Sequence, residues 1–249
     1  MVTIEALSHY TQQLMQVERF KDYCPNGLQV EGRQEVRKIV TGVTASMALL
    51  EAAQQAGADL ILVHHGYFWR NEDPRLVGIK RKRLAFLLKH ELNLMSYHLP
   101  LDAHPELGNN VQLGNLLGLK ANHYDGESNL VAFAQPSQTI ILSELACLIE
   151  QKLLRLPLVI GNPAQKINTV AWCSGAAQSY FESAIEMGAD VFISGEISEQ
   201  TTHLAQESGV SYISAGHHAT ERYGVQALGR HLAEKFNIAH EFIEIENQV

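Results

Sequence analysis

The sequence predicts an α/β protein with largely parallel sheets. Runs of branched apolar residues alternate along the chain with segments of helical periodicity, which is the pattern of strand–helix–strand units. The second half repeats the first: residues 39–66 align without a gap with residues 170–197, and both stretches contain Gly-Ala-Asp. A chain of 249 residues is long enough for one large domain or two smaller ones.

Local signals define the elements of the first half. Pro25 favours a loop over 22–32. The helix predicted over 46–58 has Ser46 in position to cap its N-terminus and Gly57 at its end. Hydrophobic periodicity predicts the remaining elements, which are helices over 3–20, 82–91 and 106–119 and strands over 38–43, 59–65 and 92–98.

The second half shows the same alternation. Strands are predicted over 130–135, 168–175, 190–196, 209–216 and 239–245, and helices over 143–154, 177–187, 198–207 and 219–235. The sequence leaves open whether the last helix and strand pack with the second half or return to the first. It also leaves open whether the repeat reflects duplication or chance similarity between two strand–helix–strand units.

Composition excludes several classes of protein. The net charge of −8 argues against binding nucleic acid through a broad basic surface, and the one basic stretch, over 78–90, is typical of a solvated helix. The three cysteines form no C-x-x-C pair, so a thiolate zinc site and a disulfide framework are not expected. The N-terminus does not resemble a signal peptide and no apolar run could span a bilayer, which predicts a cytoplasmic protein with no membrane partner.

Histidines and acids mark the ends of four predicted strands, where ligands bind in open α/β sheets. One strand ends in His64 and His65. Neighbouring residues of a strand point to opposite faces, so this pair can serve one site only where the pleat ends. The other three strands end at His98 followed by Asp102, at Glu196, and at His217 followed by Glu221.

The spacing His-x-x-x-acid occurs at corresponding places in the two halves. Residues four apart share a helix face, so His217 and Glu221 can reach the same ion. Asp102 lies next to Pro100, which favours an irregular turn. Imidazoles and carboxylates suit zinc, manganese, iron, cobalt or nickel without choosing among them, and this set could hold two ions that activate water.

The other histidines have weaker claims. His104 and His218 adjoin the cluster and could orient a ligand, and we interpret the rest as structural or surface residues: His9, His90, His203, His231 and His240. The chain contains no G-x-x-x-x-G-K-[ST], G-x-S-x-G or G-x-G-x-x-G motif, so P-loop, hydrolase-elbow and dinucleotide sites lack their signatures.

Six motifs together resemble one known family over essentially the whole chain. They are PNGLQVEG, VTGVTAS, HHGYFW, HLPLDAHPELGNN, SGEISEQ and AGHHATERYG, and they are similar to motifs of the Nif-three-like family, whose bacterial members are called GTP cyclohydrolase I type 2 homologues. No departure from the family pattern is visible at the metal positions. The longer insert that some members carry between the two halves is absent from this sequence.

The resemblance implies an architecture and a site. It implies two similar three-layer α/β domains, which we place at 1–125 and 126–249, with a dinuclear metal site in the cleft between them and assembly into a toroidal hexamer. Asp102 or Glu221 would bridge the ions, and His98 and Asn109 would line the site. Carried over residue by residue, the implied ligands are His64, His65, Asp102, His217 and Glu221.

Two functions follow as hypotheses. The family name implies opening of the imidazole ring of GTP by metal-bound water, with release of formate. The first hypothesis is therefore a metal-dependent hydrolase that acts on a nucleotide or related small molecule, and we expect His98 to move the proton. The alternative is a metal-binding ring or scaffold without turnover, serving DNA repair or metal handling. Electrostatic clamping of DNA fits poorly with the acidic charge.

Overall fold

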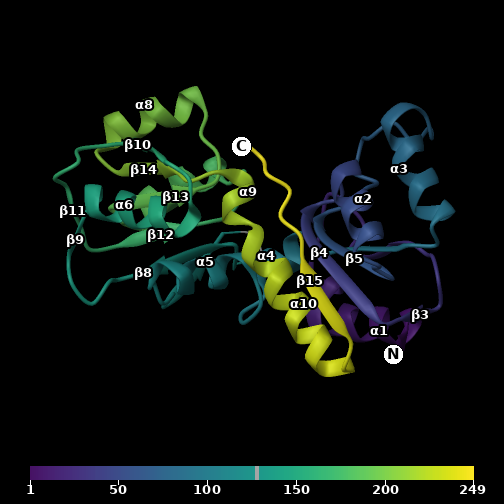
Figure 1. Cartoon of the computed structure of the whole chain (residues 1–249). Coiled ribbons are helices and arrows are strands. Elements are labelled where there is room, and N and C mark those ends of the chain that lie inside the picture. The colour runs from purple at the N-terminus through teal and green to yellow at the C-terminus, as the bar shows by residue number, and fades with distance from the viewer. Residues whose placement is uncertain (127–128) are drawn as a thin grey trace. The chain divides into compact units, whose positions relative to one another are not determined.

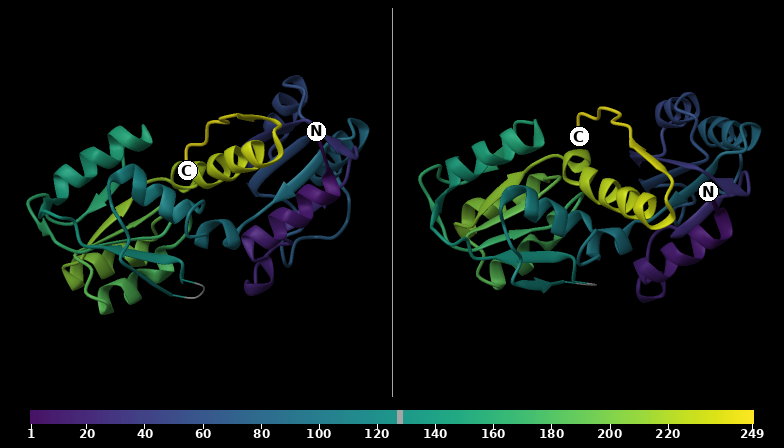
Figure 2. Two further views of the ribbon diagram at one scale, coloured as in Figure 1. Left: turned by 90° about the horizontal axis from the view of Figure 1, so that it is seen from below. Right: turned by 60° about the horizontal axis from the view of Figure 1, so that its bottom comes forward.

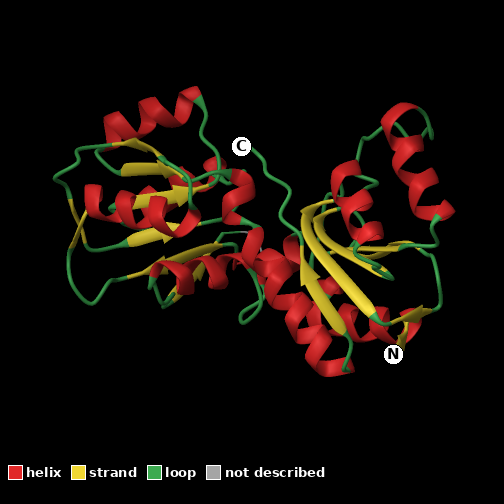
Figure 3. Cartoon of the chain, in the orientation of Figure 1, coloured by secondary structure: helices red, strands yellow, loops and turns green. Residues whose placement is uncertain are grey.

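A computed structural model describes residues 1–126 and 129–249 of the chain. It confirms the α/β fold class, because helices accompany two sheets that are rich in parallel strands (Figure 3). The chain divides into two compact units: unit 1 is Met1–Gly108 with Gly224–Glu246, and unit 2 is Asn109–Tyr223 with Asn247–Val249. In the described part of the chain, no helix combines the length and apolar character needed to cross a bilayer.

Unit 1 is built on a five-stranded sheet in the order β15-β4-β5-β6-β2. Four of its strands run parallel, and β2 joins the edge antiparallel to β6. The strands predicted over 38–43, 59–65 and 92–98 are confirmed as β4, β5 and β6. The bounds are β2 (Gly27–Val30), β4 (Lys38–Thr44), β5 (Leu60–His65), β6 (Asn93–Ser96) and β15 (Ala239–Phe242).

Helices cover both faces of this sheet, so unit 1 has three layers. Leu60 and Leu62 of β5 pack with α1 (Ile4–Met15) and α10 (Arg222–Phe236), which Figure 2 draws in purple and yellow. The alternate residues Ile61 and Val63 pack on the other face with α2 (Met47–Gln55) and α3 (Gly78–Lys89). All four side chains are fully buried, and burial of each stabilises the fold by about 1.5–3 kcal/mol.

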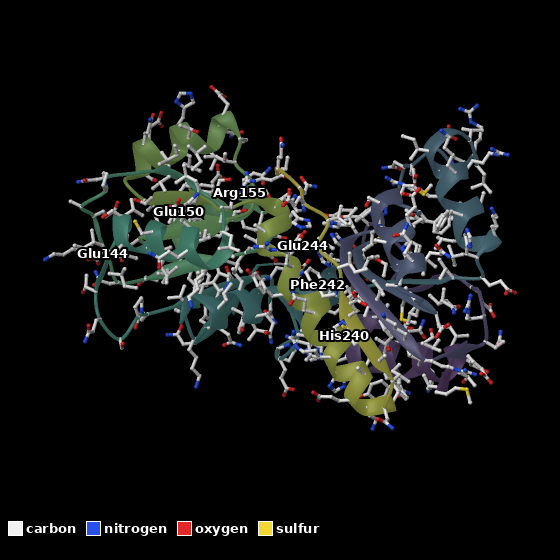
Figure 4. All side chains as sticks on the ribbon, in the orientation of Figure 1. Glu144, Glu150, Arg155, His240, Phe242 and Glu244 are labelled. Carbon is white, nitrogen blue, oxygen red and sulfur yellow. The ribbon has the colours of Figure 1, made fainter. Side chains whose placement is uncertain are left out.

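The last helix and strand contribute to unit 1. In Figure 1, β15 lies beside β4, to which it pairs in parallel. His240 and Phe242, labelled in Figure 4, are two residues apart in β15 and are its half-buried positions. The His240 Nε2 lies 2.9 Å from Thr41 Oγ1 of β4. Gly229 of α10 permits this packing, because a Cβ there would collide with the His240 ring.

Unit 2 is built on a six-stranded sheet in the order β10-β14-β13-β12-β8-β7. Its three inner strands β12, β13 and β14 run parallel, and the flanking strands are antiparallel to their neighbours. The bounds are β7 (His123–Asp125), β8 (Val131–Ala134), β10 (Leu158–Ile160), β12 (Val170–Trp172), β13 (Val191–Ser194) and β14 (Ser211–Ser214).

This second sheet is also covered on both faces. Trp172 is fully buried in a core with α5 (Asn109–Leu117) and α6 (Leu142–Leu153). On the other face, Phe181 at the start of α7 (Phe181–Glu186) packs edge-on against Tyr212, with ring centroids 4.9 Å apart. The helix α8 (Glu199–Ser208) leads into β14.

The short elements were the hardest to predict from the sequence. The loop expected over 22–32 is wrong at Gly27–Val30, because β2 is an edge strand whose pairing needs no continuous apolar run. The remaining short elements are two antiparallel pairs, β1 (Val2–Thr3) with β3 (Glu35–Val36) and β9 (Ile140–Ile141) with β11 (Lys166–Ile167), the helices α4 (Leu99–Ala103) and α9 (His217–Thr220), and 3-10 turns at Val17–Arg19 and Gln178–Tyr180.

The repeated Gly-Ala-Asp has the same structural role in both units. In each unit, the aspartate lies just before the second strand of a strand–helix–strand motif. Its carboxylate accepts backbone N–H groups at the start of the first strand of that motif. Asp59 Oδ2 accepts the N–H of Lys38, where β4 begins, at 3.1 Å, and Asp190 Oδ2 accepts the N–H of Thr169, just before β12, at 2.9 Å. The repeat therefore preserves an anchor that aligns neighbouring parallel strands.

We predict that Asp190→Ala lowers the free energy of unfolding by about 1–3 kcal/mol, because the N–H groups of Asn168 and Thr169 lose their acceptor. Urea denaturation followed by circular dichroism measures the change. Glu150→Ala, at an exposed position of α6 (Figure 4), is the control and should change stability by less than about 0.5 kcal/mol. Equal effects of the two substitutions would contradict the anchoring role.

Candidate metal centre

The first group of candidate ligands lies in unit 1 at the carboxyl ends of β5 and β6. The parallel register places Val63 opposite Ser96, so the residues that follow these two positions are neighbours. The ring centroids of His64 and His65 are 4.6 Å apart, and potential ligand atoms of His64, His65 and His98 lie within 4.8 Å of one another. At the carboxyl end of β5, the adjacent residues His64 and His65 can therefore both contribute to one site.

Hydrogen bonds orient the two adjacent imidazoles. His64 is fully buried, and its Nδ1 donates to the carbonyl of Tyr97 at 2.9 Å. The hydrogen is therefore on Nδ1, and Nε2 carries the lone pair. His65 Nδ1 lies 3.2 Å from Thr44 Oγ1, which again directs Nε2 outward. A bond from one ring nitrogen to a fixed partner is typical of metal-binding histidines.

Asp102 joins this group through a short helix. The irregular turn predicted around Pro100 is wrong: Pro100 lies in the first turn of α4, where a missing N–H has no cost, and Asp102 follows within the same helix. The Asp102 carboxylate is 8% exposed, and its Oδ1 lies 3.5 Å from His64 Nε2. His64 Nε2 and Asp102 Oδ1 are thus two potential metal-binding atoms that lie side by side.

His98 is held by an aspartate that the sequence did not single out. Its Nδ1 lies 2.7 Å from Asp22 Oδ1. Burial would raise the pKa of Asp22, but the hydrogen bonds and charge of His98, with the bond from Asn26, outweigh it and lower that pKa. No sequence pattern relates Asp22 to His98, because the two are 76 residues apart and Asp22 belongs to a loop.

Cys24 lies near Asp22 and His98, close enough for the three to be considered as a metal site. Burial, and to a smaller extent the charge of Asp22, raise the pKa of the Cys24 thiol to about 12. In the metal-free protein Cys24 is therefore a neutral thiol, whereas a metal ion binds the thiolate.

The second group of candidate ligands lies in unit 2. His217 begins α9, directly after β14, and Glu221 follows one turn later. His217 Nε2 lies 3.1 Å from Glu221 Oε2, and Nδ1 lies 2.6 Å from Glu196 Oε1, at the end of β13. Glu196, whose role the sequence left open, therefore orients His217.

The two glutamates stabilise the charged form of His217. Burial alone would lower the pKa of His217, but the bonds and charges of Glu221 and Glu196 raise it to about 9. Glu221 is only 3% exposed. Gly175 leaves room for its carboxylate, because a Cβ at Gly175 would collide with Glu221 Oε1.

The remaining predicted residues lie as follows. Asn109 is fully buried at the start of α5, and its place in a metal site stays a prediction. His104 Nδ1 accepts the N–H of Leu107 at 3.0 Å, which closes a turn. His218 is 9% exposed within α9. Each group offers imidazole and carboxylate donors, which suit borderline divalent metals such as zinc, manganese or cobalt.

Comparison with known proteins identifies the family. A family model described as Duf34/NIF3 (NGG1p interacting factor 3) matches residues 2–248. The chain belongs to the Duf34/NIF3 family. A Duf34/NIF3 relative from Neisseria meningitidis serogroup B, named "GTP cyclohydrolase 1 type 2 homolog", is 53% identical over 229 residues, which is 92% of each chain.

Solved structures agree with this assignment. A structure titled "Structural genomics, protein ybgI, unknown function" has a TM-score of 0.96 and 47% identity, and the match covers both chains completely. A structure from Thermus thermophilus has a TM-score of 0.91 and 32% identity, also over both full chains. The resemblance that the sequence motifs indicated is therefore confirmed.

We predict that Glu196→Gln lowers the pKa of His217 below about 9 in metal-free protein, because the imidazolium loses one of its two carboxylate partners. Nitrogen-15 NMR titration of the imidazole measures this pKa. Glu199→Gln serves as the control, because Glu199 pairs with the exposed His203 instead. An unchanged titration of His217 in Glu196→Gln would show that Glu196 does not stabilise its charged form.

Proposed function

We propose that this protein is a metal-dependent hydrolase that acts on a nucleotide or a related small molecule. Two divalent ions would be held by three imidazoles and two carboxylates. The proposed ligands are His64, His65, Asp102, His217 and Glu221, with Asp102 or Glu221 as the bridge.

One observation carries the metal-binding part of the proposal. Each proposed histidine ligand has its Nδ1 next to a fixed oxygen: the Tyr97 carbonyl for His64, Thr44 for His65 and Glu196 for His217. This arrangement leaves Nε2 of each ring as the nitrogen that can bind a metal. The carboxylates of Asp102 and Glu221 lie beside two of those nitrogens.

The relatives support the chemical class. Their name, "GTP cyclohydrolase 1 type 2 homolog", refers to an activity on GTP, and the reaction we propose is hydrolytic opening of the guanine imidazole ring. When bound, two divalent ions would lower the pKa of a water molecule and stabilise developing negative charge. His98, held at Nδ1 by Asp22, can then accept the proton at Nε2 and return it to the leaving nitrogen.

We predict that the purified protein binds two divalent ions per chain. His64→Ala and His217→Ala should each lower the affinity for both ions, because a bridging carboxylate couples the binding of one ion to that of the other. Elemental analysis and zinc or manganese titration measure this. His203→Ala, on the exposed face of α8, is the matched control and should keep both ions. Loss of one ion with the other unaffected would instead indicate an independent site in each unit.

We predict that the metal-loaded protein releases formate from GTP and that Glu221→Gln abolishes release, while His98→Ala lowers kcat by about 10²–10⁴-fold. Formate measurement in a screen of nucleotides tests this. A wild-type protein with both ions bound and no turnover of any nucleotide would favour the scaffold hypothesis. Glu221→Gln should keep the assembly of the wild type in either case.

We also propose a homohexamer. Exposed apolar residues of unit 2, Leu154, Leu156 and Leu158, are typical of surfaces that oligomers cover. Light scattering should give six times the chain mass of 27.7 kDa, and a monomeric mass would contradict the ring. The proposed nucleotide substrate fits a cytoplasmic location, and Cys24, Cys147 and Cys173 form no disulfide.

A further inference from the structure

Asp22 is a buried carboxylate outside the proposed ligand set, and all of its acceptor positions are used. Oδ1 accepts the N–H of Tyr23 at 2.6 Å and lies 2.7 Å from His98 Nδ1. Oδ2 accepts the Asn26 amide at 2.8 Å and the N–H of Leu99 at 2.9 Å. The side chain is 3% exposed. A carboxylate has about four lone-pair sites, so Asp22 has none left for a metal.

The same loop also fixes the backbone of His98. Asn26 Oδ1 accepts the N–H of His98 at 2.7 Å. Trp69 meets the His98 ring edge-on, with centroids 5.0 Å apart, which restricts rotation of the ring. His98 is therefore immobilised through its side chain, its backbone and its aromatic neighbour.

We propose that Asp22 is a positioning residue that keeps the hydrogen of His98 on Nδ1, so that Nε2 is left as the proton acceptor beside the His64–His65 pair. A carboxylate can only accept, so the Asp22–His98 bond requires a hydrogen on Nδ1. This inference rests on the proposed hydrolase function for its catalytic consequence, while the tautomer itself is independent of that function.

The proton balance is complete within this pair and the substrate. As the water oxygen forms a C–O bond to the substrate carbon, an O–H bond of the water breaks and an N–H bond forms at His98 Nε2. The imidazolium keeps its Nδ1 hydrogen bond to the ionised Asp22, whose pKa is lowered. The C–N bond to the leaving nitrogen then breaks while that nitrogen takes the proton from Nε2, and His98 returns to its starting form.

A competing arrangement is a metal held by Asp22, Cys24 and His98. It would require Asp22 to give up hydrogen bonds to the backbone of Tyr23 or Leu99. The loss of these hydrogen bonds disfavours it.

The decisive measurement is the tautomer of His98 in the metal-free protein, by nitrogen-15 NMR. We expect wild-type His98 to carry its neutral-state hydrogen on Nδ1. In Asp22→Asn, an amide NH₂ facing Leu99 and Asn26 would oppose two fixed donors, whereas an NH₂ facing His98 opposes only one, the N–H of Tyr23, so the NH₂ should face His98. Nδ1 then becomes the acceptor and the hydrogen moves to Nε2.

Asp59→Asn is the matched control. Asp59 is another buried carboxylate of unit 1 that accepts backbone N–H groups, and its substitution should leave the His98 tautomer unchanged. In the metal-loaded protein, we expect Asp22→Asn to keep both ions and lower kcat by about 10²–10⁴-fold. Asp22→Glu, which retains an acceptor, should recover part of this loss.

Three results would overturn the inference. The first is a wild-type His98 with its hydrogen on Nε2, which needs no variant to be detected. The second is an unchanged tautomer in Asp22→Asn. The third is a cobalt-loaded wild type with a thiolate charge-transfer band that Cys24→Ser removes. If the protein turns over no substrate, the proposed hydrolase fails, but the NMR result still decides whether Asp22 positions His98.

Discussion

Parallel pairing of β5 with β6 is the constraint on which the unit 1 ligand group depends. Parallel strands bring their carboxyl ends to one edge of a sheet, and the register from Leu60 opposite Asn93 to Val63 opposite Ser96 ends both strands together. The Tyr97 N–H continues this ladder to the Val63 carbonyl at 3.1 Å. The pairing of the two strands, and not a contact between side chains, therefore places His64 and His98 next to each other.

The features that the sequence predicted are local ones. His64 and His65 end an apolar run, and His217 with Glu221 share a four-residue spacing, so each pattern can be recognised within a few residues. Strand–helix alternation likewise predicted the α/β class and the inner strands of both sheets. The capping of α2 by Ser46, which accepts the N–H of Leu49 at 3.2 Å, is confirmed for the same reason.

The features that the sequence could not predict depend on distant segments. Asp22 acquires its role from a histidine 76 residues away, and a single sequence contains no signal for such a pair. The edge strand β2 is short and partly polar, so its residues resemble a loop until β6 is there to pair with it. Glu196 was recognised as a strand-end acid, but only the 2.6 Å approach of His217 shows which side chain it serves.

The path of the chain has a consequence for folding during synthesis. Domains generally fold in the order in which the ribosome delivers them, yet the edge strand β15 of unit 1 comes from residues 239–242. The unit 2 sheet is complete once β14 has been made, at residue 214. The N-terminal unit is thus begun first and finished last, and β4 has an open edge during translation until the final strand emerges.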